Sequence, residues 1–372
     1  MLVGVPKEIK NHEYRVGLTP ASVQEVVAHG HPVLVETRAV LGIGCSDDDY
    51  RAAGAEVVES ASEVYERAEM IVKVKEPQAG ERRMLREGQI LFTYLHLAPD
   101  PEQTRDLVES GAVCIAYETV TDGNGGLPLL APMSQVAGRM SIQAGAHALE
   151  RAHGGEGILL GGVPGVAPAK VVVIGGGVVG ENAIHMALGM GADVTVLDRN
   201  IEVLNRLSGR FGPALKTVYS TRAALEQQVL QADLVIGGVL IKGAAAPKLV
   251  TREMLPAMKP GAVLVDVSID QGGCFETSRP TTHADPIYLV EDVVHYCVAN
   301  MPGAVPRTST YALNNVTLPY VLALADNGYR SALSDNRSFL EGLNVYRGKV
   351  TCEAVARDLG YDYVPPVDAL AA

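Results

Sequence analysis

Short apolar runs alternate with longer amphipathic stretches from the amino terminus to about residue 130. The apolar runs predict strands, because each is short and ends at polar or turn-forming residues. They lie at Leu2–Val5, Pro32–Glu36, Ala55–Val58, Met70–Val74, Gln89–Tyr94 and Val113–Tyr117. Strands that alternate with helices form parallel sheets with helices on both faces. This part of the chain is therefore expected to be an α/β domain.

Helix starts can be recognised between these strands. Thr19 and Pro20 supply an N-cap and a first-turn proline for one helix. Ser46 supplies the N-cap of the next helix. Three aspartates follow it, and their negative charge stabilises the positive end of the helix dipole. These signals fix where the first two helices begin.

The second half of the chain repeats the alternation of strands and helices. Its strands are predicted at Val171–Ile174, Val194–Leu197, Lys216–Tyr219, Leu234–Gly237, Val263–Val267 and Ile287–Val290. Roughly six strands match a complete dinucleotide fold with two mononucleotide halves. The pattern as a whole predicts the α/β class, with two Rossmann-like, doubly wound parallel-sheet domains separated by a cleft and linked by long helices.

Two long helices are expected to connect the domains. Met133–His153 follows a turn-rich break, and Tyr311–Asp326 contains Pro319, which is expected to kink it. The pattern of the tail after that helix predicts mainly helices, and the tail is expected to return to the first domain. The predicted domains are therefore discontinuous, with a substrate domain of residues 1–132 plus 308–372 and a nucleotide-binding domain of residues 133–307.

A glycine cluster follows the strand Val171–Ile174 directly. Gly175, Gly177 and Gly180 form a G-x-G-x-x-G motif at the start of an amphipathic helix. Such glycines serve a tight turn, the close approach of a pyrophosphate to the backbone, and close packing of helix on strand. Asp198 ends the next strand, where a carboxylate accepts hydrogen bonds from ribose hydroxyls and repels a 2′-phosphate. The motif predicts a dinucleotide site that favours NAD over NADP, rather than an ordinary glycine-rich turn.

Composition narrows the possible functions. The 372 residues suggest about two domains, and the net charge of −12 argues against a nucleic-acid-binding surface. The five cysteines are scattered without a C-x-x-C pair, which is typical of reduced thiols in a cytoplasm and predicts no metal site. No signal peptide and no apolar run long enough to span a bilayer are visible. A soluble, cytoplasmic protein is expected.

Four side chains with useful chemistry follow predicted strands. Arg15, Lys75 and His96 come after the first, fourth and fifth strands, and Asp270 comes after Val263–Val267. Ligands of open α/β sheets bind outside the carboxyl ends of the strands. Each residue alone could be a solvated charge, a strand-end residue or a turn cap. Their shared placement favours a catalytic role for the set.

These residues lie in segments that resemble the alanine dehydrogenase and pyridine nucleotide transhydrogenase alpha-subunit family. The similar segments are GVPKEIKNHEYRVGLTP, VKVKEP, YLHLA, the block from Met133 through GGVPGVAP to VLD, VDVSIDQGG and VANMPGAVPRTST. The resemblance covers essentially the whole chain. It implies NAD-dependent oxidative deamination of L-alanine to pyruvate and ammonium, reversibly, with hydride transfer to nicotinamide C4 and acid/base catalysis through carbinolamine and imine. It also implies a homohexamer.

The resemblance assigns roles residue by residue. Arg15 would bind the substrate carboxylate, Lys75 the carbonyl oxygen of pyruvate, and His96 and Asp270 would transfer protons. The division of proton transfers between His96 and Asp270 stays open, and Val203 stands where relatives can have a basic residue. The cofactor positions implied by the motif and the resemblance are Ser134, Gly175, Gly177, Val178, Gly180, Asp198, Ser220, Val239, Leu240, Val267, Ser268, Ile269, Asp270, Arg279, Val298, Ala299, Asn300 and Met301.

Three alternative hypotheses for the function remain. A transhydrogenase-type NAD(H)-binding subunit would exchange hydride with a second nucleotide protein and would not turn over alanine. A catalytically silent nucleotide-binding protein would tolerate loss of His96. A saccharopine-type dehydrogenase would need room for a much larger substrate.

Overall fold

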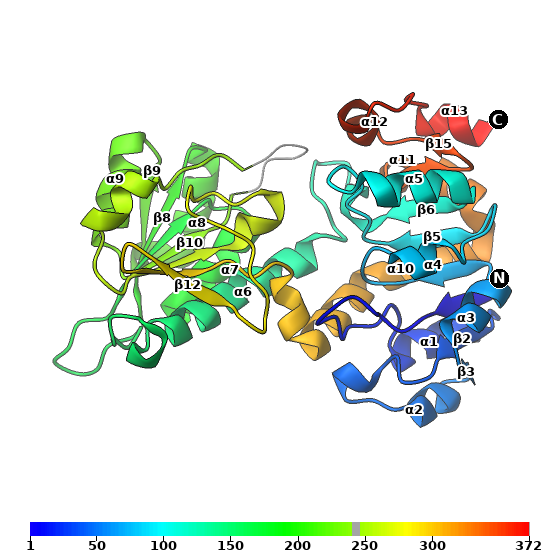
Figure 1. The fold of residues 1–372 in the computed structure, drawn as a ribbon, viewed down its shortest axis with the longest axis horizontal. Coiled ribbons are helices and arrows are strands. Elements are labelled where there is room, and N and C mark those ends of the chain that lie inside the picture. Colours follow the sequence, from blue (N-terminus) through cyan, green and yellow to red (C-terminus); the bar gives the residue numbers. More distant parts are fainter. Residues whose placement is uncertain (240–245, 372) are drawn as a thin grey trace. The chain divides into compact units, whose positions relative to one another are not determined.

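The computed structural model describes residues 1–239 and 246–371. The chain divides into two compact units, the first made of Met1–Met133 and Val305–Ala372 and the second of Ser134–Ala304. Each unit contains one sheet with helices around it (Figure 1). The sequence prediction had placed the boundaries at 132/133 and 307/308. The α/β fold class is confirmed, with one sheet for each half of the alternating pattern.

The sheet of the first unit has eight strands in the order β15-β14-β6-β5-β4-β1-β2-β3. The pairs from β3 through β6 are parallel, as predicted, and β14 and β15 pair antiparallel at one edge. The strands are β1 Val3–Val5, β2 Val33–Glu36, β3 Glu56–Val58, β4 Met70–Val72, β5 Ile90–Thr93, β6 Val113–Ala116, β14 Leu343–Tyr346 and β15 Lys349–Val350.

The predicted parallel sheet does not extend to this edge, and the tail, which is mainly helical as predicted, also contains the two strands β14 and β15. Arg347 and Gly348, which join β14 to β15, both have positive φ, 45° and 85°. Two such residues in succession form a tight hairpin turn whose twist matches the strands. The tail therefore supplies an antiparallel hairpin, and β14 pairs with β6 at the sheet edge.

The helices of the first unit are α1 Pro20–Ala28, α2 Asp47–Ala52, α3 Ala61–Arg67, α4 Ala79–Arg82, α5 Pro101–Ser110, α10 Pro306–Ser334, α11 Arg337–Leu340, α12 Glu353–Leu359 and α13 Pro366–Ala371. Both predicted N-caps are present, because Thr19 accepts from the Ser22 N–H and Ser46 forms a capping box with Asp49. The kink of α10 shown by its backbone angles is at Gly328 (φ 71°, ψ 156°), beyond the predicted end of the helix at Asp326, and Pro319 lies inside the helix. Only glycine adopts this backbone conformation without strain.

Buried polar contacts hold α10 to the first unit. The side-chain oxygen of Asn314 accepts from the Thr19 backbone N–H at 2.8 Å and from the Ser22 hydroxyl at 2.9 Å. Its amide nitrogen donates to the Thr310 carbonyl oxygen at 3.1 Å. Asn314 is 2% exposed, so each of these groups would lack water if the contact were removed. The carboxyl-terminal segment thus returns to the unit that the amino terminus begins.

The sheet of the second unit has seven strands in the order β12-β13-β11-β10-β7-β8-β9, and only the β12–β13 pair is antiparallel. Six of the strands were predicted; β13 was not, because its apolar run is separated from β12 by only two residues, Glu291 and Asp292, which adopt positive φ. The strands are β7 Lys170–Ile174, β8 Asp193–Asp198, β9 Leu215–Tyr219, β10 Leu234–Gly237, β11 Val263–Asp266, β12 Ile287–Val290 and β13 Val293–Tyr296.

The longest helix of this part of the chain is shorter than predicted. It begins at Ala131 and ends at Ala148, and a 3-10 turn, η3 Arg151–His153, follows it. The helices here are α6 Ala131–Ala148, α7 Val178–Gly189, α8 Ile201–Phe211 and α9 Arg222–Gln231. Within residues 1–239 and 246–371, no helix combines the length and apolarity that crossing a membrane requires.

Replacing Asn314 tests the docking of α10. We expect Asn314→Ala to lower the free energy of unfolding by about 2–3 kcal/mol, because the Thr19 N–H and the Ser22 hydroxyl lose a buried acceptor. Asn327→Ala is the control on the same helix, since Asn327 is exposed and bonds only to the Ala323 carbonyl; a change below about 0.5 kcal/mol is expected there. Urea unfolding followed by circular dichroism measures both. Equal effects of the two variants would contradict the contact.

Candidate functional site

Three functional candidates follow three neighbouring strands of the first unit. Strands β1, β4 and β5 lie side by side in the order β5-β4-β1. Arg15 lies in the loop after β1, and Lys75 and His96 follow the ends of β4 and β5. Parallel strands end at the same edge of a sheet, which is where ligands of such sheets bind. The fold thus brings a guanidinium, an ammonium and an imidazole to one edge.

Arg15 is buried and paired with Glu13. Its Nε donates to Glu13 Oε1 at 2.6 Å and its Nη2 to Oε2 at 2.5 Å, a parallel two-bond fork. Burial opposes the charge of Arg15, but the Glu13 carboxylate outweighs it and raises the pKa of the guanidinium. Glu13 therefore fixes the plane of the guanidinium, and Nη1, on its other edge, donates to Met133 Sδ at 3.0 Å.

The Arg15 loop lies against the end of β4. A Cβ added to Gly17 would lie 2.3 Å from the Val72 carbonyl oxygen, so the two backbones touch. The Thr310 hydroxyl accepts from the Val16 N–H at 3.4 Å, which ties the same loop to α10. The position of Arg15 is set by backbone contacts on two sides.

A fully buried lysine with two carboxylates lies beneath this edge. Lys73 Nζ is 2.6 Å from Glu81 Oε1 and 3.2 Å from Glu8 Oε2, and all three residues are at most 6% exposed. Glu8 Oε1 also accepts from the backbone N–H groups of Val74, at 2.7 Å, and Lys75, at 3.3 Å. One carboxylate thus connects the loop after β1 to the segment that carries Lys75.

The charges of this group depend on one another. Burial raises the pKa of Glu8, and Lys73 and the Val74 N–H only partly oppose that effect. Burial would lower the pKa of Lys73, but Glu8 and Glu81 outweigh it and raise the pKa instead. The ammonium is therefore held in its charged form by its two carboxylate partners.

Lys75 is partly exposed and lies next to a carboxylate. Its Nζ is 3.9 Å from Glu76 Oε2, and Lys10 pairs with the other oxygen of Glu76. Burial would raise the pKa of Glu76, but Lys75 and Lys10 together lower it. The Thr93 hydroxyl donates to the Lys75 carbonyl oxygen at 3.0 Å, which joins the ends of β4 and β5.

His96 has a strained backbone and an exposed ring. Its φ is 49°, in the left-handed region, and its N–H donates to Glu118 Oε1 at 2.6 Å. The ring is 44% exposed, stacks on Tyr94 with an interplanar angle of 4°, and places Nδ1 3.8 Å from the same Glu118 oxygen. Strain of this kind persists where surrounding contacts hold it and is common at functional sites.

Three supporting carboxylates were missed in the sequence analysis. Glu13, Glu8 and Glu118 each fix a candidate residue or its backbone. Glu8 and Glu118 follow the ends of β1 and β6, but the sequence analysis assigned no role to either. Glu13 had a weak signal, since it stands two residues before Arg15. Glu8 and Glu118 contact residues 22 to 67 positions away, a separation that no local pattern reveals.

The glycine loop of the second unit has the geometry that its motif predicts. Gly175 has a φ of 96°, and a Cβ on Gly180 would lie 1.8 Å from the Gly175 carbonyl oxygen. Gly177, at the N-cap of α7, has no heavy atom within 4 Å of an added Cβ and leaves open space. The loop therefore combines a tight turn, close helix packing and an approach for a phosphate at a helix N-terminus.

Asp198 braces this loop from the end of β8. Its Oδ2 accepts from the Gly176 N–H at 2.7 Å and its Oδ1 from the Asn200 N–H at 2.8 Å. Val203 lies against Gly176, 2.6 Å from an added Cβ. One turn further along α8, Arg206 donates to the Gly176 carbonyl oxygen at 3.1 Å and pairs with Glu181. A guanidinium thus reaches the loop although position 203 is apolar.

A buried carboxylate shapes the loop that carries Asp270. Asp266 ends β11, is fully buried, and accepts from the backbone N–H groups of Ser268, Cys274 and Phe275 at 3.0, 2.9 and 3.2 Å and from the Ser278 hydroxyl at 2.5 Å. Burial raises the pKa of Asp266, and these donors only partly offset it. Asp270 itself is exposed in the 3-10 turn η6 Val267–Gln271.

The other predicted cofactor positions are spread over the loops of the second unit. The Ser268 hydroxyl donates to the Val239 carbonyl at 2.8 Å and accepts from its N–H at 3.1 Å, which joins the loops after β10 and β11. The Arg279 guanidinium lies 4.1 Å over the Tyr288 ring. Leu240 lies outside the described residues. The remaining positions are Ser134 early in α6, Val178 at the start of α7, Ser220 after β9, Val267 and Ile269 within η6, and Val298–Met301 after β13.

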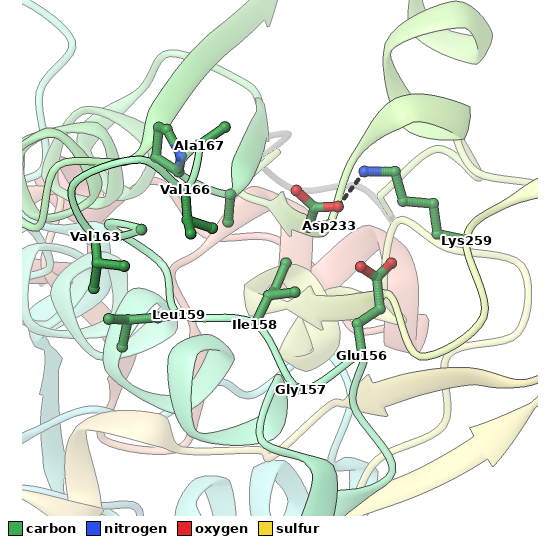
Figure 2. A pocket seen from close by; sticks show the side chains of 12 residues that line it. Glu156, Gly157, Ile158, Leu159, Val163, Val166, Ala167, Asp233 and Lys259 are labelled. Carbon is green, nitrogen blue, oxygen red and sulfur yellow. Dashed lines mark hydrogen bonds and ion pairs between the residues drawn. The ribbon is translucent and has the colours of Figure 1, made fainter.

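The hollow in Figure 2 is a different feature of the second unit. It has a volume of about 400 Å³ and contains an ion pair of Asp233 and Lys259 beside Glu156. Asp233 precedes β10, and its carboxylate accepts from the Lys170 N–H at the start of β7. It lies at the amino ends of these strands, whereas the glycine loop follows the carboxyl end of β7. This hollow is not the predicted nucleotide site.

Comparison with known proteins identifies relatives over the whole chain. Residues 4–137 match the family model "Alanine dehydrogenase/PNT, N-terminal domain" and residues 141–353 match "Alanine dehydrogenase/PNT, C-terminal domain". An alanine dehydrogenase of Halomonas elongata is 63% identical over 364 residues, which are 98% of each chain. An alanine dehydrogenase of Mycolicibacterium smegmatis is 56% identical over the full length of both chains.

A solved structure gives the same result. The chain is similar to an L-alanine dehydrogenase with a TM-score of 0.94 and 52% identity, covering 97% of this chain and 99% of the other. A transhydrogenase from Sinorhizobium meliloti is more distant, with a TM-score of 0.82 and 25% identity, covering 95% of this chain and all of the other.

Removing the buried ammonium tests the charge network beneath the site. We expect Lys73→Met to lower the free energy of unfolding by about 3–5 kcal/mol at pH 8, because Glu8 and Glu81 would remain buried without their counter-ion. The deficit should shrink towards pH 5. A carboxyl whose pKa is raised in the folded state stabilises the fold at low pH, and this contribution is lost as the pH rises.

Lys7→Met is the control for this variant, because Lys7 is exposed on the same unit. Its effect should stay within about 0.5 kcal/mol at both pH values. Urea midpoints at pH 5 and pH 8 provide the measurement. A deficit for Lys73→Met that does not change with pH would show that the carboxylates are not the cause.

Proposed function

The chain belongs to the alanine dehydrogenase/PNT family, and from this premise we propose that it oxidises L-alanine with NAD. L-alanine, NAD⁺ and water give pyruvate, ammonium, NADH and a proton, and the reaction is reversible. The observation that carries the proposal is the placement of Arg15, Lys75 and His96 after three neighbouring strands of one sheet.

Two cations of this set suit an amino-acid substrate. The planar guanidinium of Arg15, oriented by Glu13, matches the two oxygens of a carboxylate. The ammonium of Lys75 would donate to the oxygen that forms at the substrate α-carbon and stabilise its developing charge. The Glu8 contacts to the Val74 and Lys75 backbone support a fixed position for this lysine.

His96 and Asp270 are the proposed acid/base groups. One of them would take a proton from the substrate amine, and together they would move protons as water adds to the imine and the carbinolamine releases ammonium. Both side chains are exposed, His96 on a backbone held by Glu118 and Asp270 on a loop held by Asp266. These contacts hold the backbone at His96 and the loop that carries Asp270, and so support a fixed position for each residue.

The residues of the glycine loop fit a dinucleotide. Gly177 leaves room for a pyrophosphate at the start of α7, and Asp198 stands at the end of β8, where it would accept from ribose hydroxyls. The bound NAD would supply the hydride acceptor, C4 of its nicotinamide. The carboxylate of Asp198 supports NAD over NADP because it would repel a 2′-phosphate.

A transhydrogenase-type subunit is the weaker alternative. The transhydrogenase structure shares 25% of its sequence with this chain, whereas the relatives of the alanine dehydrogenase kind share 52–63%. That difference favours an enzyme that acts on an amino acid over one that passes hydride to a second nucleotide protein.

Assembly and location complete the proposal. We propose a homo-oligomer, a hexamer as the family resemblance implies, which light scattering coupled to gel filtration would test. A cytoplasmic location is proposed from the cysteines, since Cys45, Cys114, Cys274, Cys297 and Cys352 are all unpaired thiols.

The catalytic proposal is tested through His96. Purified protein with L-alanine and NAD should form NADH, seen by its near-ultraviolet absorbance, and His96→Ala should lower kcat by about 10²–10⁴-fold, the usual contribution of a general acid/base. His29→Ala is the control, because His29 is an exposed histidine of the same unit that pairs with Asp326; its kcat should change less than about twofold. Absence of turnover in protein that still binds NADH would instead favour a transhydrogenase-type subunit or a catalytically silent nucleotide-binding protein.

Cofactor choice is tested through Asp198. We expect Asp198→Asn to lower the ratio of kcat/KM for NAD over NADP by about tenfold or more, since hydrogen bonds to a charged acceptor contribute roughly 1.5–3 kcal/mol. Asparagine keeps one acceptor oxygen for the loop. Asp193→Asn, at the other end of β8 and paired with Lys216, should leave the ratio unchanged. An unchanged ratio in Asp198→Asn would rule out this residue as the selector.

A further inference from the structure

Three potential metal ligands converge where α6 ends. His147 lies in the last turn of the helix, Glu150 follows it, and His153 ends the 3-10 turn η3. Their ligand atoms all lie within 4.8 Å of one another, and no other group of three or more such side chains does so in the part of the chain that the structure describes. The cluster belongs to the second unit and is separate in sequence from every residue of the proposed reaction.

The spacing of these atoms is close to that of a metal centre. His147 Nδ1 is 3.3 Å from Glu150 Oε1, and His153 Nδ1 is 3.8 Å from Glu150 Oε2. In a tetrahedral zinc site with bonds of about 2.1 Å, neighbouring ligand atoms are ~3.4 Å apart. The ring centroids of the two histidines are 3.9 Å apart, so the two imidazoles are in contact with each other. Two imidazoles that bind one ion at tetrahedral positions have centroids ~5 Å apart, so the rings must separate by about 1 Å for both to bind.

The backbone beneath the cluster is well held. The Gly155 N–H donates to the Glu150 carbonyl at 3.2 Å and the Gly157 N–H to the Leu149 carbonyl at 2.8 Å. A Cβ on Gly155 would lie 2.3 Å from the Leu149 carbonyl carbon, so the chain after the turn packs directly on the end of α6. The three ligands therefore come from a backbone whose shape does not depend on an ion.

We propose that His147, Glu150 and His153 bind a divalent transition-metal ion of the Zn²⁺ class. Two imidazoles and one carboxylate select such ions, whereas Mg²⁺ and Ca²⁺ prefer oxygen ligands only. The side chains of His147 and Glu150 are 65% and 59% exposed, so water completes the coordination. The ion links the last turn of α6 to η3. Binding through His153 Nδ1 replaces the contact of that nitrogen with the His147 carbonyl, at 3.1 Å, and binding through Nε2 keeps it.

A second histidine pair provides a matched comparison within the same chain. His29 and His31 both contact the Asp326 carboxylate, at 3.0 and 2.8 Å. This group has the same ligand types, but its three ligand atoms do not all lie within 4.8 Å of one another. Convergence of the ligand atoms, rather than the presence of two histidines near an acid, distinguishes the proposed site.

The test is Co²⁺ binding to the full-length protein after treatment with a chelator, followed by visible absorption and competed with Zn²⁺. The wild type should bind one equivalent of Co²⁺ per chain, displaced by Zn²⁺. His153→Ala and Glu150→Gln should each weaken this binding by tenfold or more, and His31→Ala should leave it unchanged.

The two variants at the proposed site change exposed or half-buried side chains, and circular dichroism checks that each retains the fold. Equal Co²⁺ affinity in the wild type, His153→Ala and Glu150→Gln would overturn the proposal. So would a loss of binding in His31→Ala as large as in His153→Ala, because the ion would then bind elsewhere.

Discussion

The contact between Lys73 and its two carboxylates is the constraint on which the first unit's functional edge depends. It connects three segments that the sequence separates: the loop after β1 through Glu8, the end of β4 through Lys73, and α4 through Glu81. A buried ammonium is unfavourable unless it is paired and hydrogen-bonded. The three segments must therefore stay together, and Lys75 follows the lysine by only two residues.

In the second unit, Asp266 holds the backbone at the end of a strand in a similar way. Asp266 ends β11 and receives three backbone N–H groups from the loop that it precedes. In both units a buried carboxylate accepts backbone donors next to the end of a parallel strand, in or beside the segment that carries a candidate residue. Parallel strands end at an edge where the chain must turn in irregular loops, and irregular backbone needs partners for its N–H groups. The carboxylates supply these partners.

Features set by local geometry could be predicted from the sequence, whereas features set by contacts between distant residues could not. The glycine loop was predicted in detail because its function lies in the backbone: the positions of Gly175 and Gly180 follow from local geometry. Parallel strands were predicted because they are continuous apolar runs. Strand β14 was not, because its pairing with β6 joins residues more than 200 positions apart. The sequence analysis expected a kink in α10 at a proline and missed the one at Gly328, a glycine with positive φ.

Stability alone does not account for the buried charges beneath Lys75. Apolar side chains of similar volume often replace a buried ion pair at no cost in stability, and sometimes with a gain. They would, however, leave the N–H groups of Val74 and Lys75 without the acceptor that Glu8 provides. Unsatisfied N–H groups would favour a different path of the chain at this point. Because the carboxylate fixes the backbone and the lysine neutralises the carboxylate, the network is best understood as the device that holds the backbone of Lys75 in place.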